Sequence, residues 1–324
     1  MKRKVIGIGE TILDILFRDG QPTAAVPGGS VFNGIISLGR MGVPVDFISE
    51  TGNDRVGRTI LDFMRANGVE TSHVNVFPEG KSPLSLAFLD EHNDADYLFY
   101  KDYPSQRLDV VFPEIAPDDI VMFGSYFALN PVLRPKVLEF LTYAREHGAL
   151  LYYDVNFRST HASDAIKLTS TILENFELAD IVRGSTDDFR HMFGITDADR
   201  IYTDKVKFYC PRLICTSGPE AVTLHSEQVS KTYPVPPVET VSTVGAGDNF
   251  NAGIVYGLLS EGIRRDDLPR LTEADWDAVI RSGMDFSAEA CRNLGNSVSL
   301  DFAEKRKKGA CETPRSVLYC HSLK

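Results

Sequence analysis

Much of the chemical information in this chain lies in one stretch, Ser242-Thr243-Val244-Gly245-Ala246-Gly247-Asp248-Asn249-Phe250. Apolar residues recur at helical spacing from 249 to 261, which predicts a helix that begins just after the glycines. We therefore expect open backbone N–H groups at residues 245–247, where small side chains let an anion such as a phosphate come close. A carboxylate beside this turn would repel the anion, so its presence there indicates a separate chemical function. We infer that Asp248 is a general base, which takes a proton from a hydroxyl that attacks a phosphoryl group. Taken alone, the same stretch is equally consistent with a capped helix start that has no chemical role.

The composition is that of a globular protein large enough for an enzyme. Its 324 residues are 43% hydrophobic and 24% charged, sufficient for one large α/β domain or two smaller ones. A net charge of −11 argues against a general nucleic-acid or membrane-surface binder. The five cysteines contain no CxxC pair, which argues against a disulfide framework or structural zinc and favours a reducing cytoplasm. Gly7 and Glu10 interrupt the first apolar run too early for a signal sequence, so we expect a strand there.

Strand-like and helix-like segments alternate along the chain. β-rich runs lie at 4–8, 45–49, 120–123, 150–155, 181–183 and 213–216, and helical periodicity covers 31–41, 56–67, 132–147 and 274–291. This alternation predicts a parallel sheet covered by helices. Two extended segments, about 11–26 and 82–101, have no helix of their own, and either a small sheet over a cleft or separate surface hairpins would account for them. The basic run at 305–308 indicates a solvated turn.

A second small-residue motif, Gly28-Gly29-Ser30-Val31-Phe32-Asn33, precedes a helical run about two hundred residues before the first motif. Together the two motifs resemble those of the ribokinase-type (PfkB) carbohydrate kinases, and within that family the chain is most similar to fructokinases. Further resembling segments are Gly52-Asn53-Asp54-Arg55-Val56-Gly57, Asn67-Gly68-Val69, Asp154-Val155-Asn156-Phe157-Arg158 and Thr216-Ser217-Gly218. The resemblance implies a single kinase domain over residues 1–324, with a three-layer α/β sandwich around a mostly parallel sheet. It also implies a small β lid, built from 11–26 and 82–101, through which the protein would form a homodimer.

The resemblance also assigns roles to individual residues. Those expected to bind the sugar are Asp14, Gly28, Gly29, Asn33, Lys101 and Arg158. Those expected near ATP are Thr216, Gly218, Ser185 and Asp188. Mg²⁺ would be held through the ATP phosphates and water, without direct protein ligands. Without the resemblance, Asp14 would be a turn residue, Asn33 a helix-start residue and Arg158 a surface ion-pair partner.

Three departures from the family pattern bear on nucleotide and ion binding. Ala221 replaces the last glycine of the family's TxGxxG nucleotide loop. The stretch 185–188 replaces the Asn-x-x-Glu that usually lies near magnesium and the phosphate waters. Ser242 stands where many members have an acidic ligand for a monovalent cation, which makes a requirement for such a cation doubtful.

These observations predict an ATP-dependent sugar kinase, most similar to a fructokinase, that phosphorylates a primary hydroxyl. Asp248 would be the base, and the amides of Gly245, Ala246 and Gly247 would stabilise charge on the transferred phosphoryl group. One alternative is a kinase of the same family that acts on ribose, 2-keto-3-deoxygluconate or a nucleoside. Another is a non-catalytic sugar- or nucleotide-binding regulatory protein, which the altered 185–188 stretch would suit and the intact Asp248 argues against. The expected partners are a sugar and ATP, not nucleic acid or a membrane.

Overall fold

A computed structural model describes residues 3–89 and 95–310 of the chain. Within these residues the main sheet has ten strands in the order β14-β13-β12-β11-β10-β9-β1-β4-β5, with β6 paired to β4. The strands are β1 (Val5–Ile8), β4 (Val45–Gly52), β5 (Val69–Glu70), β6 (Val74–Phe77), β9 (Ile120–Gly124), β10 (Leu150–Asp154), β11 (Ile181–Ser185), β12 (Leu213–Ser217), β13 (Ala221–His225) and β14 (Ser230–Pro234). The six predicted strands are all present and pair in parallel, whereas β13 and β14 add an antiparallel edge.

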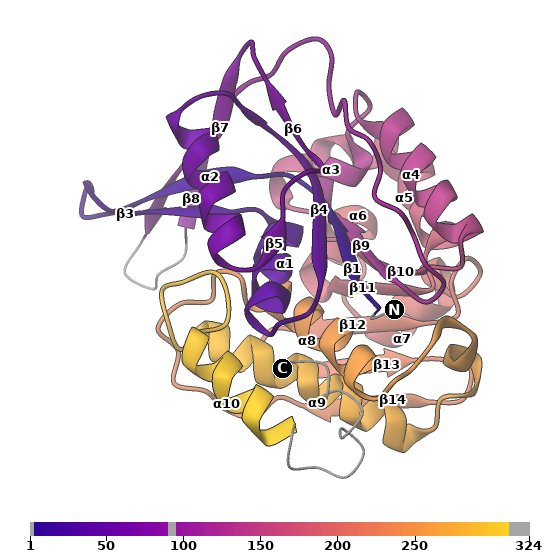
Figure 1. The fold of residues 1–324 in the computed structure, drawn as a ribbon. Coiled ribbons are helices and arrows are strands. Elements are labelled where there is room, and N and C mark those ends of the chain that lie inside the picture. Colours follow the sequence, from indigo (N-terminus) through magenta and orange to yellow (C-terminus); the bar gives the residue numbers. More distant parts are fainter. Residues whose placement is uncertain (1–2, 90–94, 311–324) are drawn as a thin grey trace.

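Helices cover both faces of this sheet, so the predicted three-layer α/β sandwich is confirmed (Figure 1). One apolar core lies under α1 (Ser30–Arg40), α2 (Arg55–Ala66), α8 (Ala246–Ser260), α9 (Glu273–Cys291) and α10 (Leu300–Ala310). The other lies under α3 (Ser125–Leu129), α4 (Arg134–Glu146), α5 (Ala165–Leu178), α6 (Thr186–Phe193) and α7 (Ala198–Ile201). The parallel strands read as nearly continuous apolar runs because both of their faces are buried.

The two helix-poor segments pair with each other in a separate four-stranded sheet of order β3-β2-β7-β8. Its strands are β2 (Ile12–Arg18), β3 (Gln21–Gly28), β7 (Lys81–Leu89) and β8 (Ala95–Asp102), and part of this sheet projects to the left of the main body in Figure 1. β2 pairs with β7 in parallel, with Asp14 opposite Ser85. Residues 90–94 of the second segment lie outside the described residues, as do 1–2 and 311–324, which include Cys311 and Cys320. The prediction of a single domain over 1–324 therefore stays a prediction.

The structure corrects the interpretation of the basic run 305–308, which lies within helix α10 and does not form a turn. Lys and Arg favour helices, and this helix is anchored because Ala303 is buried in the core and Phe302 packs against it. Arg306 also pairs with Asp285 across 2.6 Å. The polarity of the run reflects a solvated helix face.

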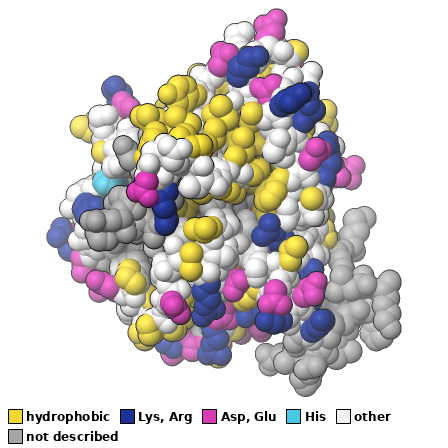
Figure 2. All heavy atoms as spheres, turned by 90° about the vertical axis from the view of Figure 1, so that its left-hand side faces the viewer, with side chains coloured by type: hydrophobic (Ala, Val, Ile, Leu, Met, Phe, Trp, Pro, Cys, Tyr) yellow, Lys and Arg dark blue, Asp and Glu magenta, His cyan; other side chains and the backbone are white. Residues whose placement is uncertain are grey.

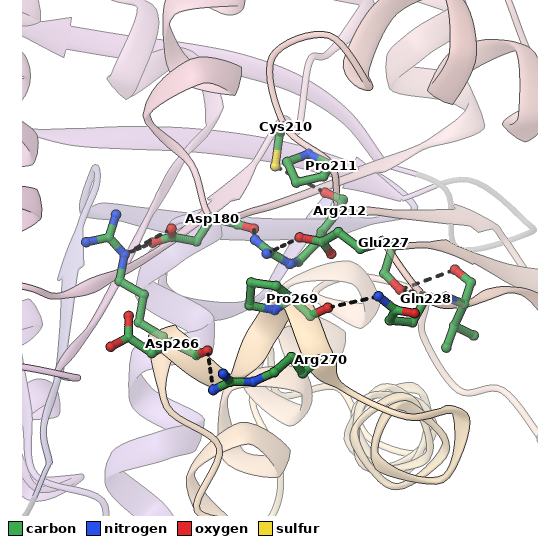
Figure 3. Close-up of polar contacts among 12 residues, drawn as sticks. Asp180, Cys210, Pro211, Arg212, Glu227, Gln228, Asp266, Pro269 and Arg270 are labelled. Carbon is green, nitrogen blue, oxygen red and sulfur yellow. Dashed lines mark hydrogen bonds and ion pairs between the residues drawn. The ribbon is translucent and has the colours of Figure 1, made fainter.

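Paired charges close the amino ends of β11 and β12 (Figure 3). Arg212, just before β12, donates from Nη1 to the Asp180 carbonyl at 2.9 Å and pairs with Glu227. The Asp180 carboxylate is 3.0 Å from Nε of Arg265.

The strand order of the main sheet reverses at β1, which lies between β4 and β9. In open α/β sheets, ligands bind in the crevice at such a point, at the carboxyl ends of the strands. Within 3–89 and 95–310, no helix combines the length and apolar character needed to cross a membrane.

Candidate active site

The two glycine motifs of the sequence meet in space at the carboxyl end of the sheet. Asn33 in α1 donates from Nδ2 to Asp248 Oδ2 in α8 at 2.8 Å, across 215 positions of sequence. The helices pack closely, since a Cβ on Gly34 would lie 3.1 Å from the Asp248 carbonyl oxygen. Asn33 Oδ1 is buried without a hydrogen-bond partner among the described residues. Asn33 therefore orients Asp248 and keeps one acceptor for another group.

Asp248 is a buried carboxylate in the first turn of α8, with 8% of its surface exposed. Burial raises the pKa of its carboxyl group to about 6, although the Asn33 hydrogen bond and the charge of Arg158 act in the opposite direction. At neutral pH such a group is mostly ionised and still has an appreciable affinity for a proton. These are the properties of a general base.

The loop before α8 differs in one respect from the sequence prediction. The helix begins at Ala246, three residues earlier than expected, with Gly245 at the N-cap in the left-handed region at φ 78°. The Ala246 N–H donates to the Thr243 carbonyl at 3.2 Å, so the expectation of an open amide at Ala246 is wrong. The amides of Gly245 and Gly247 have no acceptor among the residues that the structure describes. Two open amides at a helix N-terminus form a site suited to an anion.

Asp14 faces the same space from the small sheet. Ser85 donates its hydroxyl to Asp14 Oδ1, and burial raises the pKa of this carboxyl group to about 6, with Glu10 and Asp248 adding to the effect. A Cβ on Gly28 would lie 2.5 Å from Asp14 Oδ2, so this position accepts only glycine while that carboxylate is in place. Gly29 has φ 134°, and a Cβ there would collide with the Glu10 carbonyl. The two glycines thus allow the backbone to pass close to Asp14 and Glu10.

The two predicted cationic residues lie at the edge of this space. Lys101 on β8 pairs with Glu10 across 2.6 Å, which links the small sheet to the end of β1. Arg158 is exposed and precedes the short 3-10 helix Ser159–Asp164. Its charge lowers the pKa of Asp248, which places the guanidinium within electrostatic reach of the carboxylate.

Of the four residues predicted near ATP, Ser185, Asp188 and Thr216 have side-chain partners within the protein. Ser185 and Asp188 form a reciprocal capping box at the start of α6, in which the Ser185 N–H donates to Asp188 Oδ2 at 2.7 Å. The hydroxyl of Thr216, at the end of β12, accepts a hydrogen bond from Arg183 at 2.8 Å. Gly218 follows in a left-handed turn, with no atom within 4 Å of a built Cβ. The open surroundings of Gly218 leave room for a ligand, whereas the capping box uses Ser185 and Oδ2 of Asp188 and leaves Asp188 Oδ1 outside it.

Arg183 is a site residue that the sequence analysis missed. It lies buried on β11, where Nη1 is 2.9 Å from Asp154 Oδ1, and a Cβ on Gly247 would be 3.1 Å from Nη2. Burial acts to lower the pKa of this guanidinium, but Asp154 and neighbouring groups raise it overall, so Arg183 stays charged. Its positive charge lies beneath the loop with the open amides. The sequence did offer a signal, because an arginine stands within an apolar strand that is predicted to be buried. A buried charge is costly unless it has a partner, so such an arginine indicates a partner or a function.

The family description "pfkB family carbohydrate kinase" matches residues 4–302, and the chain belongs to this family. The fructokinase of Rhizobium leguminosarum bv. trifolii is 27% identical over 267 residues, which cover 80% of this chain and 81% of that protein. The solved aminoimidazole riboside kinase of Salmonella enterica, complexed with aminoimidazole riboside and an ATP analog, superposes with a TM-score of 0.79 at 23% identity and covers 94% of this chain and 100% of that chain. The solved fructokinase of Vibrio cholerae O395, in its fructose, ADP and calcium ion bound form, superposes with a TM-score of 0.80 at 20% identity. The superposition covers 92% of this chain and 96% of that chain. The predictions of a ribokinase-like fold and a carbohydrate kinase are confirmed.

Proposed function

We propose that this carbohydrate kinase transfers the γ-phosphoryl group of ATP to a primary hydroxyl of a ketohexose, with fructose as the first candidate. One observation carries the proposal: Asp248 is buried, with its pKa raised to about 6, and lies beside open amides at a helix N-terminus. A base and an anion site next to each other suit an attacking hydroxyl and a transferred phosphoryl group. The fructokinase of Rhizobium leguminosarum and the fructose and ADP in the Vibrio cholerae complex favour fructose and ATP.

In this proposal each group of the site has a separate role in the reaction. Asp248 takes the proton of the attacking hydroxyl, and Asn33 keeps the carboxylate in place through its 2.8 Å hydrogen bond. The amides of Gly245 and Gly247 stabilise charge on the phosphoryl group, with the buried Arg183 charge beneath them. Asp14 holds sugar hydroxyls, and the small sheet acts as a lid that limits the access of water.

Mg²⁺ is the cation that we propose for the ATP phosphates, whose charge it would neutralise. The donor set nearby suits a hydrated cation, since Asp154 Oδ2 is buried without a hydrogen-bond partner among the described residues. Asp188 lies close enough for Asp154 to contribute to its raised pKa. Asp154 and Asp188 would receive hydrogen bonds from water molecules around the cation.

Two further proposals concern surroundings and assembly. Cys210 and Cys215 are buried free thiols, which favours the cytoplasm as a reducing compartment.

The outer face of the small sheet supports a homodimer. Side chains alternate between the two faces of a strand, so a set of apolar side chains lies on the face opposite to that of Asp14 and Ser85. This set consists of Leu13, Ile15, Phe17, Leu84, Leu86, Phe88, Leu98 and Tyr100. Leu98 and Tyr100 are 50% and 57% exposed, and Figure 2 shows hydrophobic side chains gathered on this side of the molecule. A second copy of the chain would cover them.

The test of the proposed reaction is ADP release measured with fructose, ribose, 2-keto-3-deoxygluconate and adenosine as separate acceptors. We expect fructose to give the highest kcat/KM, and mass spectrometry to find one added phosphate on the sugar. A higher value for another acceptor would assign the chain to a different kinase of the family. Tight sugar binding without ADP release would support the non-catalytic alternative and contradict the proposal.

A further inference from the structure

The segment 296–298 is held in place by the two helices of the site. Asn249 in α8 donates from Nδ2 to the Asn296 carbonyl at 2.9 Å. The Val298 N–H donates to the hydroxyl of Ser37 in α1 at 3.0 Å. These bonds fix the backbone of Asn296 between the two glycine motifs. Any side chain at this position would therefore be presented to the site from a rigid support.

The side chain of Asn296 is committed to no other group. The residue is 7% exposed, and its side-chain amide has no hydrogen-bond partner among the described residues. Its Nδ2 lies 3.5 Å from the point that a Cβ of Gly28 would occupy, and Asp14 Oδ2 lies 2.5 Å from the same point. Asp14 Oδ1 is used by Ser85, whereas Oδ2 has no partner in the part of the chain that the structure describes. An unused donor and an unused acceptor thus converge beside Gly28.

Packing does not explain why this residue is an asparagine. The hydrogen bond that Asn296 makes with its neighbours uses its backbone: its carbonyl accepts from Asn249, and a Cβ on Gly245 would lie 2.9 Å from the same oxygen. Any residue would supply these backbone interactions. A largely buried amide with no internal partner keeps only limited hydrogen bonding to water. The amide is therefore available to hydrogen-bond a ligand that enters this space.

We propose that Asn296 is a sugar-binding residue that sets specificity together with Asp14. One sugar hydroxyl would donate to Asp14 Oδ2 and accept from Asn296 Nδ2, since a hydroxyl is donor and acceptor at once. This hydroxyl differs from the one that reacts at Asp248. The pair would select sugars by the configuration at that carbon. The inference rests on the proposed sugar kinase activity and adds a ligand to it.

The experiment compares Asn296→Ala and Asn296→Asp with the unmodified enzyme and with Leu294→Ala as control. Leu294 lies in the same loop and is 58% exposed. We expect Asn296→Ala to raise the sugar KM about tenfold, the effect of one or two lost hydrogen bonds, while the ATP KM and the melting temperature stay unchanged. Leu294→Ala should change none of these quantities.

Asn296→Asp keeps the size of the side chain but places an acceptor and a charge beside Asp14. We expect sugar binding, measured by calorimetry with a non-hydrolysable ATP analogue, to weaken more than in Asn296→Ala at pH 8. Relative to the unmodified enzyme at each pH, part of this loss should be recovered at pH 5.5, where a protonated carboxyl group again donates. A purely structural role for Asn296 would produce no such pH dependence.

The results separate this inference from the proposed function. An unmodified enzyme that phosphorylates a sugar, with an Asn296→Ala variant of unchanged sugar KM, overturns the role of Asn296 and leaves the kinase proposal intact. An equal rise of the sugar and ATP KM values also overturns it. If the unmodified enzyme phosphorylates and binds none of the panel sugars, both proposals are wrong.

Discussion

In its proposed role as general base, Asp248 has to be charged, yet it lies in a buried position that disfavours the charged form. Its burial is compensated only in part by Asn33 and Arg158, so its pKa is raised to about 6. The sequence shows the carboxylate and the glycines beside it, but its proton affinity depends on Asn33, 215 positions away. At the scale of single residues, the chemistry therefore depends on contacts between distant parts of the chain.

Asp248→Asn should fold and bind ATP but lose about 10² to 10⁴-fold in kcat, because it removes general-base catalysis. Steady-state ADP release and calorimetry with an ATP analogue measure the two properties separately. A folded Asp248→Asn enzyme with near-normal kcat would contradict the assignment of the base.

The same variant should gain stability at alkaline pH. A carboxyl group whose pKa is raised on folding stabilises the native state below its unfolded pKa of 3.8, and this contribution is lost as the pH rises through about 6. Replacing the carboxylate removes a cost of about 3 kcal/mol at pH 8. The gain in melting temperature over the unmodified protein should thus be larger at pH 8 than at pH 4.5.

Activity of the unmodified enzyme should fall as the pH drops through about 6. Asp14 and Asp248 both have pKa values raised to about 6 by burial, and the proposed mechanism needs both in the carboxylate form. The profile of log kcat/KM against pH should reach a slope between one and two on its acidic side, measured in a buffer series of constant ionic strength. A flat profile down to pH 5 would exclude these two groups as the titrating pair.

At the scale of elements, α8 holds the site because it packs against α9 through glycines. A Cβ on Gly253 would collide with the Ser282 carbonyl and lie 2.7 Å from Gly283 Cα, whereas one on Gly257 would meet Val279 Cα at 3.0 Å. The apolar pattern predicts both helices, but the backbone contact between them follows only from their packing.

Gly253→Ala should destabilise the protein by about 1–3 kcal/mol and lower kcat, because α8 must shift away from α9 and carries Asp248 with it. Gly257→Ala should cost less, since its nearest contact is longer. Ser260→Ala, on the exposed end of the same helix, is the matched control. Urea unfolding measures all three, and equal losses for the three variants would contradict this account of the packing.

The loop before α8 bears on the monovalent cation. The hydroxyl of Ser242 is neutral and accepts from the Val244 N–H at 3.2 Å, so one of its two lone pairs is used within the loop. We expect activity to depend little on K⁺ compared with Na⁺ or a bulky organic cation, and Ser242→Asp to increase the dependence by adding a charge. Strong, saturable activation of the unmodified enzyme by millimolar K⁺ would show that backbone carbonyls suffice.

For the whole molecule, the apolar outer face of the small sheet predicts association. Leu98→Glu should give a monomer in light scattering coupled to size exclusion, because a charge on this face opposes its burial. Val132→Glu is the control, since Val132 is also exposed but lies outside this sheet, just before α4. A monomeric unmodified protein, or a dimer unaffected by Leu98→Glu, would remove this face as the interface.

The sequence by itself determined the fold class and indicated Asp248 as the candidate base. Buried parallel strands are apolar on both faces, so the six runs between 4 and 216 could be read directly, and the turn at 245–248 shows its amides and carboxylate locally. The start of α8 and the helical state of 305–308 were misread, because helix ends and polar helix faces carry weak local signals.

Only the tertiary structure decided which groups act together. It brings together segments that are far apart in the chain: Arg183 lies beneath Gly247, Asn33 contacts Asp248, and Asn296 and Asp14 both lie beside Gly28. It also decided which groups are already used within the protein, such as the Ala246 amide and, in the capping box, Ser185 with Oδ2 of Asp188. Burial and hydrogen bonding determine which groups lie together and which are already used. Both burial and these hydrogen bonds arise only when distant segments pack together.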